Sequence, residues 1–285
     1  MVPGSTVANL TALWAARELA GVREVVASDM AHLSVAKAAH ILGLGFRSVS
    51  SDHLGKMRRD ELGDLREACL VLTAGTTSTG SVDELLPAPK AAWVHVDAAW
   101  AGPLMLTRTH MHLLAGIEEA DSVAVSAHKW LWQPKDSALV FFKEADRAHG
   151  AVSFGGAYLA VPNVGVLGSS GARAVPLAAT LMTLGLEGIA LRLDECMSLA
   201  SRFVNLLAAD GNFEIWSEPE TGVIAWRPQK GDPAALRATL AASDIHVSQT
   251  RLQGEIWLRS VAVHPAIDVD RVYQKAATYA EGRSS

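Results

Sequence analysis

The chain has 285 residues and a formal net charge of -5, so it is long enough for a large domain with a smaller one and lacks the basic excess that binds nucleic acid. Its two cysteines, Cys69 and Cys196, lie far apart, which argues against a disulfide framework or a cysteine metal site. The first residues lack the features of a signal peptide, and Asp97 interrupts the apolar run at 93–105, so we expect no membrane-spanning segment. From the cysteines and the charge we expect a cytoplasmic protein without a nucleic-acid partner.

The first half of the chain alternates short apolar runs with helical patterns. This alternation is typical of a mostly parallel sheet flanked by helices. The predicted strands cover 24–27, 47–50, 69–73, 93–97, 122–126 and 138–142, and the predicted helices cover 6–19, 33–42, 59–68 and 112–119. We therefore predict an α/β large domain over residues 1–185.

The second half begins with a segment rich in Gly, Pro and Ser at 150–171, which we expect to form a long loop at the rim of the site. A long helix is predicted at 176–209, with an interruption near 185–188. Strands near 222–227, 244–248 and 255–261 and a helix at 269–280 then predict a small C-terminal α+β domain. We place it at residues 186–285.

Two predicted strands of the large domain end in polar residues, Asp97 on one and Lys129 shortly after the other. Parallel strands end at one edge of a sheet, where α/β folds bind their ligands, so both side chains are expected in one pocket. A buried carboxylate needs a cation or a strong donor, and a buried lysine becomes a neutral amine that can react with an aldehyde. Taken singly, Asp97 could cap a turn and Lys129 could be a surface lysine.

The motifs that contain these residues resemble those of a known family. HVDAAWAG at 95–102 and ADSVAVSAHKWL at 120–131 resemble the signature of the group II pyridoxal-phosphate decarboxylases of fold type I, which include the aromatic-amino-acid and glutamate decarboxylases. The resemblance implies that Lys129 forms the Schiff base with pyridoxal 5′-phosphate and that Asp97 pairs with the pyridine nitrogen. It also implies that Ala99 packs against the ring and that Ser126 and His128 contact the phosphate.

Three weaker motifs agree with this resemblance. SDMAHLSVAKA at 28–38 is similar to the family segment whose histidine stacks on the cofactor ring, which assigns that role to His32. GTTSTGSVD at 75–83 is similar to the segment that places a threonine near the cofactor and substrate, here Thr76 or Thr77. GSTVANLTALWAAR at 4–17 resembles the phosphate-binding turn, with Ser5 and Thr6 at a helix N-terminus. Alternatively, His32 is an ordinary half-buried histidine and the Ser-Thr pair is a plain helix cap.

The resemblance implies a lyase that removes the α-carboxylate of an amino acid as carbon dioxide and releases an amine. Family members have an additional N-terminal arm that wraps the partner subunit, and a tyrosine on a mobile loop that protonates the carbanion. Neither is present in this sequence, in which Tyr158 is the only tyrosine close to that loop. Tyr158 is our candidate for the proton donor, with a packing role as the alternative. We expect a substrate site more open than in the family.

Other functions remain open at this point. The same Lys129 and Asp97 would serve β- or γ-elimination, transamination or oxidative deamination, and the chain could instead be a catalytically degenerate subunit of a hetero-oligomer. The family is dimeric, which predicts a homodimer here. Trp100 and Arg259 are candidates for binding the substrate amino acid, since a guanidinium pairs well with a carboxylate, although Arg259 could equally form a surface ion pair. No metal site is predicted.

Overall fold

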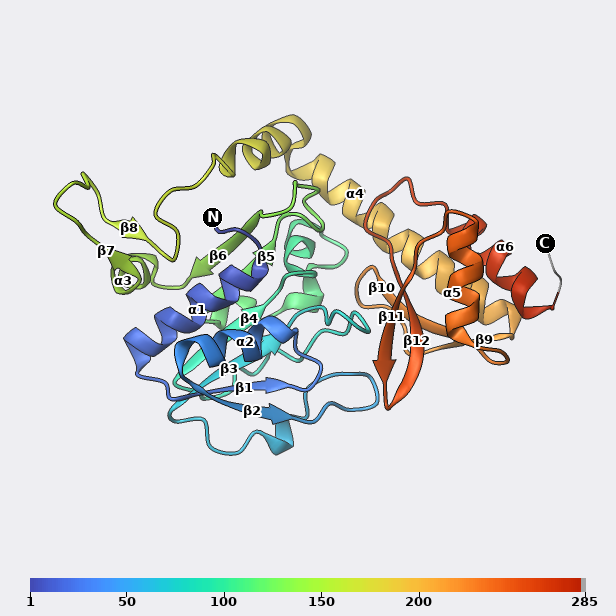
Figure 1. Cartoon of the computed structure of the whole chain (residues 1–285), viewed down its shortest axis with the longest axis horizontal. Helices are drawn as coiled ribbons and strands as arrows, with labels where there is room; N and C mark the ends of the chain where they lie inside the picture. Colours follow the sequence, from blue (N-terminus) through green and yellow to red (C-terminus); the bar gives the residue numbers. More distant parts are fainter. Residues whose placement is uncertain (283–285) are drawn as a thin grey trace.

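The large domain is built on a six-stranded sheet. The computed structural model describes residues 1–282, and its main sheet has the strand order β2-β1-β3-β4-β5-β6 (Figure 1). The strands are β1 (Glu24–Ser28), β2 (Gly45–Val49), β3 (Ala68–Thr73), β4 (Trp93–Asp97), β5 (Ser122–Ser126) and β6 (Ala138–Phe142). All neighbouring pairs are parallel except β5 and β6. The predicted α/β class with a mostly parallel sheet is therefore confirmed.

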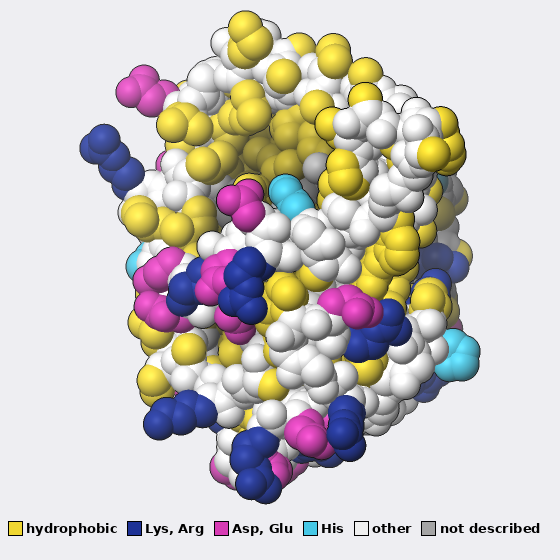
Figure 2. Space-filling view, turned by 90° about the vertical axis from the view of Figure 1, so that its left-hand side faces the viewer, with side chains coloured by type: hydrophobic (Ala, Val, Ile, Leu, Met, Phe, Trp, Pro, Cys, Tyr) yellow, Lys and Arg dark blue, Asp and Glu magenta, His cyan; other side chains and the backbone are white. Residues whose placement is uncertain are grey.

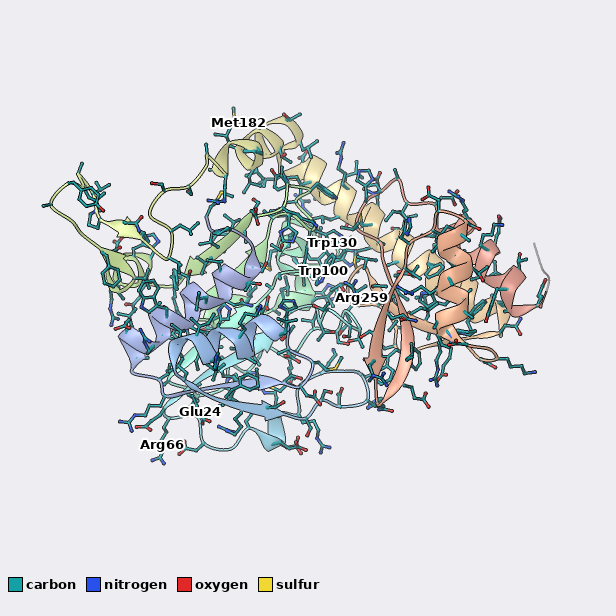
Figure 3. The ribbon with its side chains drawn as sticks, viewed as in Figure 1. Glu24, Arg66, Trp100, Trp130, Met182 and Arg259 are labelled. Atoms are coloured by element: carbon teal, nitrogen blue, oxygen red, sulfur yellow. The ribbon has the colours of Figure 1, made fainter. Side chains whose placement is uncertain are left out.

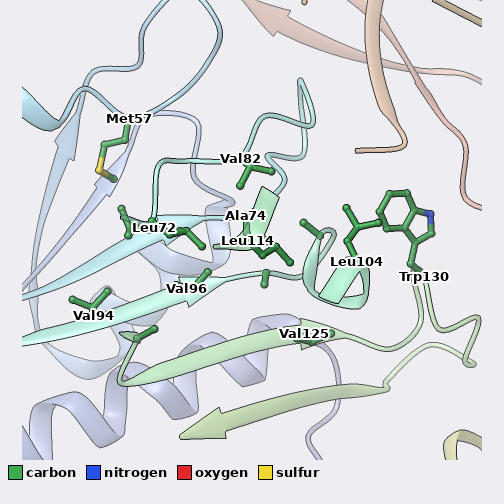
Figure 4. Packing of buried hydrophobic residues seen from close by; sticks show 14 of the residues in the cluster. Met57, Leu72, Ala74, Val82, Val94, Val96, Leu104, Leu114, Val125 and Trp130 are labelled. Atoms are coloured by element: carbon green, nitrogen blue, oxygen red, sulfur yellow. The ribbon is translucent and has the colours of Figure 1, made fainter. Parts of the chain in front are cut away.

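Side chains of the central strands alternate between two buried clusters. Along β3, Leu70 and Leu72 belong to a cluster on one face of the sheet, and Cys69 and Val71 belong to a cluster on the other. All six residues of this strand are buried, as expected for a strand covered on both faces. Figure 4 shows the first cluster, in which side chains of the sheet pack against the segment that contains Leu104.

Helices α1 (Ser5–Ala20) and α2 (Leu33–Leu42) pack against each other and cover one face of the sheet (Figure 1). The predicted helix at 59–68 was wrong beyond its first turn. Only the short 3-10 helix η1 (Arg59–Glu61) forms, because Gly63 has a φ of 64° and turns the chain into β3. The predicted helix at 112–119 is two 3-10 turns, η3 (Met111–Leu114) and η4 (Ile117–Glu119), divided by Gly116 with a φ of 95°.

Helix α4 (Ala174–Asp210) connects the two halves of the molecule (Figure 1). Its predicted interruption is confirmed, because Gly185 has non-helical backbone angles (φ 63°, ψ 176°). By length and a mean hydropathy of 1.6, α4 is also the one described helix that meets the requirements for crossing a membrane. From Ile189 onward, however, its apolar side chains pack into both hydrophobic cores. That packing supports a place in the protein core for this part of the helix.

A four-stranded antiparallel sheet forms the smaller part, in the order β11-β12-β10-β9. Its elements are β9 (Phe213–Ile215), β10 (Val223–Pro228), α5 (Pro233–Ala242), β11 (Ser248–Leu252), β12 (Glu255–Val261) and α6 (Val269–Ala280). The expected α+β architecture is confirmed, but β9 and α5 were missed. The strand predicted at 244–248 was placed too early, because Asp244 has a left-handed backbone (φ 59°) that ends the preceding helical segment.

The two hydrophobic cores meet within α4. Cys196 and Met197 belong to the core of the large domain, and Ala200 and Phe203 belong to that of the smaller one. The predicted boundary after residue 185 coincides with the kink in α4, whereas the division between the cores lies about four helical turns further along. The boundary at 185 stays a prediction.

A tight backbone contact at Gly80 joins the two domains. Its carbonyl oxygen accepts a hydrogen bond of 3.1 Å from Thr221 Oγ1, and a Cβ added at Gly80 would lie 2.7 Å from the carbonyl oxygen of Val223. Gly80 also has a φ of 77°. Only glycine satisfies both the backbone angle and the close approach.

Substitution of Gly80 by alanine is therefore expected to weaken the contact between the domains. We expect a loss of about 1–2 kcal/mol in the free energy of unfolding from the left-handed backbone, and a further loss of about 1–3 kcal/mol from the steric clash. Gly43→Ala is the matched control, because Gly43 has a φ of 69° but nothing within 4 Å of an added Cβ. Urea denaturation checks this result, and equal losses in both variants would contradict it.

The predicted loop at 150–171 contains a small hairpin and carries exposed apolar side chains. Helix α3 (Ala145–Ala151), which was not predicted, leads into the two-residue strands β7 (Ser153–Phe154) and β8 (Asn163–Val164). Figure 2 views this side of the molecule and shows hydrophobic side chains around a hollow. The exposed apolar residues of this segment and of the following start of α4 are Phe154, Tyr158, Leu159, Val161, Val164, Val166, Leu167, Val175, Leu181, Met182, Leu186 and Leu191.

Candidate active site

A cavity of about 290 Å³ lies where β4 ends, beside the N-terminal ends of α1 and α2. It brings together most of the residues predicted from the sequence. Those that line it are Ser5, Thr6, His32, Thr77, Asp97, Ala99, Trp100, His128 and Lys129. Since β3, β4 and β5 are parallel, their carboxyl ends share this edge of the sheet, as the strand-end reasoning predicted.

Asp97 is the last residue of β4 and is only 3% exposed. Its Oδ2 accepts a hydrogen bond of 2.8 Å from Asn9 Nδ2, and its Oδ1 accepts one of 3.1 Å from the backbone N–H of Ala99. The Ala99 contact is the turn cap that was the alternative explanation for this residue. Among the described residues no ion pair includes Asp97, so this buried carboxylate can still pair with a cationic group in the cavity.

Lys129 follows β5 and is half-buried, so it is not an ordinary surface lysine. Its Nζ lies 4.4 Å from the centroid of the Trp100 ring. Burial lowers the pKa of Lys129 to about 8, nearby Asp97 opposes this shift, and the positive charge of Arg259 adds to it. The side chain is therefore much easier to deprotonate than an exposed lysine, whose pKa is about 10.4.

The lowered pKa predicts how Lys129 reacts with aldehydes in the cofactor-free protein. Burial disfavours the ammonium form, so the reactive neutral amine increases about tenfold per pH unit up to a pH of about 8 and then levels off. Reductive methylation with formaldehyde, followed by mass spectrometry of the peptide that contains Lys129, measures this profile. A reactivity that continues to rise to pH 10, as for exposed lysines, would contradict the prediction.

His32 lies at the N-cap of α2 and faces the cavity. Its Nδ1 accepts a hydrogen bond of 3.2 Å from the backbone N–H of Ser34 and lies 2.8 Å from Ser34 Oγ. Burial lowers the pKa of His32, and this effect is opposed by the negative charge of Asp97. The local contacts fix the ring at the helix end, so His32 presents a neutral, oriented imidazole to the cavity.

The N-terminus of α1 is suited to an anion. Gly4 is the N-cap and provides no side-chain hydrogen bond, so neither Ser5 nor Thr6 is the cap that was the alternative explanation. Ser5 Oγ is buried and has no hydrogen-bond partner among the described residues. Free donors at a helix N-terminus bind phosphate well, because the helix dipole adds to their hydrogen bonds.

Trp100 and Arg259 lie at the junction of the two domains, where Figure 3 shows them close together. Arg259 belongs to β12, its guanidinium carbon is 5.7 Å from the centroid of the Trp100 ring, and its Nε donates to the carbonyl oxygen of Thr77. Burial lowers its pKa. No ion pair of Arg259 occurs within the part of the chain that the structure describes, so the surface ion pair considered above is not formed.

Four predicted residues are not among those that line the cavity: Arg259, which lies beside it over Trp100, and Thr76, Ser126 and Tyr158. The hydroxyl of Thr76 lies 2.6 Å from that of Thr79. Of the two adjacent threonines, Thr77 is the one that lines the cavity. Ser126 is fully buried, and its Oγ lies 3.2 Å from His128 Nδ1. Tyr158 is 88% exposed in the β7–β8 hairpin, so the structure does not place its hydroxyl where the predicted proton transfer requires it.

Other residues of the site were missed in the sequence. The additional residues that line the cavity are Pro3, Gly4, Thr73, Gly75, Lys135 and Asp136. Thr73 ends β3 next to Asp97 on β4, so the strand-end rule could have identified it. Asn9 contacts Asp97 from the buried side of α1, and its polarity among mostly apolar buried residues was the available signal. The described residues contain no group of three or more His, Cys, Asp or Glu that could hold a metal ion.

Comparison with known proteins shows the family. The model of the pyridoxal-dependent decarboxylase conserved domain matches residues 3–229. Aspartate 1-decarboxylase of Aliivibrio fischeri is 28% identical over 285 residues, which cover 84% of this chain and 51% of that protein. Aromatic-L-amino-acid decarboxylase of Sus scrofa is 30% identical over 261 residues, covering 82% and 54%. The chain thus spans about half the length of these relatives.

Solved structures show the same fold. The 4-hydroxyphenylacetaldehyde synthase of Rhodiola rosea matches with a TM-score of 0.86 and 20% identity, covering 100% of this chain and 70% of that one. The tryptophan decarboxylase of Catharanthus roseus in complex with L-tryptophan matches with a TM-score of 0.85 and 21% identity, covering 99% and 69%. Together with the match over residues 3–229, these findings show that the chain belongs to the pyridoxal-dependent decarboxylase family.

Proposed function

We propose that this protein removes the α-carboxylate of an amino acid as carbon dioxide, with pyridoxal 5′-phosphate held as a Schiff base on Lys129. The observation that carries the proposal is the meeting of Lys129 and Asp97 in one cavity with the N-terminus of α1. These groups supply an amine with a lowered pKa, a buried carboxylate without an ion-pair partner among the described residues, and a free anion site. Pyridoxal phosphate carries the three matching groups: an aldehyde, a basic ring nitrogen and a phosphate.

The residues present therefore fit this cofactor. Ser5 and Thr6 would hold the phosphate at the start of α1, and the orphaned hydroxyl of Ser5 gains a partner there. His128 lines the same cavity and would contact the phosphate from the side of Lys129. Asp97 would hold the ring nitrogen in its protonated form, and His32 would pack against the ring.

When bound, the protonated ring withdraws electrons from the substrate α-carbon, which makes loss of carbon dioxide feasible. The side chains of the cavity would control the protonation of the ring and of the substrate. Asp97 would keep the ring nitrogen charged, because a neutral ring would leave the buried carboxylate unpaired. Lys129 Nζ lies 4.4 Å from the centroid of the Trp100 ring in the cavity and would be an amine able to hold or return a proton there.

Arg259 is the group that we assign to the substrate carboxylate. Its guanidinium lies over Trp100, which lines the cavity, and it has no acidic partner among the described residues. A half-buried cation of this kind gains most from a bidentate carboxylate. The carbonyl oxygen of Thr77 accepts from Arg259 Nε and so fixes the direction of the side chain.

We also propose a homodimer. The hairpin and the first half of α4 expose many large apolar side chains, among them Val161 (74% exposed), Met182 (85%) and Leu186 (67%). Figure 3 shows Met182 at the outer edge of α4, away from both cores. A second copy of the chain would bury this surface, since large apolar side chains exposed together commonly mark a protein–protein interface.

Product analysis tests the proposed reaction. The purified chain is supplied with pyridoxal phosphate and with carboxyl-labelled amino acids, among them aspartate, histidine and the aromatic amino acids. We expect labelled carbon dioxide and the matching amine from at least one of them. Retention of the label in every product would exclude decarboxylation, and activity of the chain by itself would exclude a degenerate subunit that needs another protein.

A further inference from the structure

A line of buried polar side chains extends from Asp97 away from the cavity. Trp93 Nε1 donates to Ser122 Oγ at 2.9 Å, and Ser122 Oγ lies 2.9 Å from His95 Nδ1. On the other side of the imidazole, His95 Nε2 lies 3.0 Å from Asn9 Oδ1, and Asn9 Nδ2 donates to Asp97 Oδ2 at 2.8 Å. Both His95 and Asn9 are fully buried. We call these five residues the buried network.

The ends of the buried network, together with a neutral His95, indicate the direction of its hydrogen bonds. The indole of Trp93 can only donate, and an ionised Asp97 can only accept. Asn9 Nδ2 therefore donates to Asp97, so Asn9 Oδ1 accepts from His95 Nε2. In a neutral imidazole Nδ1 then accepts from Ser122 Oγ, which in turn accepts from Trp93, although the carbonyl oxygen of Ser122 also lies 3.2 Å from Nδ1. Burial lowers the pKa of His95 to about 4, although Asp97 opposes the shift, which agrees with a neutral imidazole. The opposite orientation of the Asn9 amide would place its oxygen against the Asp97 carboxylate.

Asn9 also connects a second group of the site. Its Nδ2 donates a second hydrogen bond, of 2.9 Å, to Ser34 Oγ, which lies 2.8 Å from His32 Nδ1. The side-chain amide of Asn9 on α1 thus donates one hydrogen bond to Asp97 on β4 and one to Ser34 at the start of α2. Both branches end at side chains that line the cavity, which a polar group buried only for packing does not require.

From this geometry we infer that Asn9 is a positioning residue that orients the Asp97 carboxylate toward the cofactor ring nitrogen and, through Ser34, holds the His32 ring. The inference rests on the proposed function, because it assigns the ring nitrogen to Asp97. His95 and Ser122 support Asn9 by fixing which way its amide points. Asn9 does not contact the ligand itself. Its effect on ligand affinity through Asp97 therefore requires a ring nitrogen for Asp97 to hold.

The experiment compares two ligands of the cofactor-free protein. One is pyridoxal phosphate, and the other is its deaza analogue, in which carbon replaces the ring nitrogen. Because a charge-assisted hydrogen bond to Asp97 is lost, Asn9→Leu is expected to weaken binding of pyridoxal phosphate by about tenfold to a hundredfold. Binding of the deaza analogue should change by less than about threefold, within the variation expected of an uncoupled site. Equal losses for both ligands would overturn the inference and leave only a structural role for Asn9.

Two further variants complete the design. Thr11→Val removes another buried polar group of α1, whose one hydrogen-bond partner among residues 1–282 is the backbone oxygen of Val7, and should leave both affinities unchanged. Ser122→Ala keeps Asn9 in place and serves if Asn9→Leu does not fold. It should weaken binding of pyridoxal phosphate alone, by between about twofold and tenfold, and an equal effect on the analogue would again contradict the inference. Failure of the wild-type chain to bind pyridoxal phosphate would instead contradict the proposed function.

Discussion

Replacing Lys129 by alanine is expected to remove both the covalent attachment of pyridoxal phosphate and the activity. Burial lowers the pKa of this half-buried amine to about 8, and the amine shares the cavity with Asp97 and the start of α1, so Lys129 is prepared to react with the aldehyde. Loss of a residue that acts covalently reduces kcat by at least about a thousandfold. Borohydride reduction followed by mass spectrometry locates the attachment, and the rate of amine formation gives kcat.

Lys135 provides the matched control, because it lines the same cavity. In Lys135→Ala the adduct should remain on the peptide that contains Lys129, and kcat should fall far less. Lys129→Ala should still bind pyridoxal phosphate weakly, through the start of α1. An adduct on Lys135, or substantial activity in Lys129→Ala, would show that the assignment of the amine is wrong.

Much of the large domain could be predicted from its sequence because its inner strands β1, β3, β4 and β5 are largely buried and even the edge strand β6 is an apolar run. β4, β5 and β6 form at the predicted residues, since continuous apolar runs leave few alternatives. The errors lie where a single glycine determines the backbone. Gly63 and Gly116 have positive φ angles that break two predicted helices, and periodicity does not report such angles. The short strand β9 contributes three residues, too few for a recognisable pattern.

The site was predictable to the extent that it lies at strand ends. Asp97 and Lys129 meet in one cavity because β4 and β5 are parallel neighbours. Which of two adjacent residues faces the cavity was not predictable, as Thr76 and Thr77 show. The contacts of Asn9 join residues up to 88 positions apart, and these depend on how α1 packs on the sheet.

Replacing Asp97 by asparagine tests the role of the buried charge. The amide has nearly the same shape as the carboxylate, and its oxygen can still accept the hydrogen bond from Asn9. It has no negative charge with which to keep the cofactor ring nitrogen protonated. We expect a loss in kcat of about a thousandfold, comparable to the removal of one preorganised group that stabilises developing charge. The adduct on Lys129 should still form, because the amine is untouched.

The pH dependence separates this electrostatic role from a loss of structure. Without the carboxylate, the ring nitrogen loses its proton more readily, so the remaining activity of Asp97→Asn should fall as the pH rises over a range in which the wild type is constant. Asp136→Asn is the control, since Asp136 is another carboxylate on the cavity wall, and it should keep the wild-type profile. If Asp97→Asn kept more than about a tenth of kcat, less than one pKa unit of electrostatic stabilisation would come from this residue, and the charge of Asp97 could not be what keeps the ring protonated.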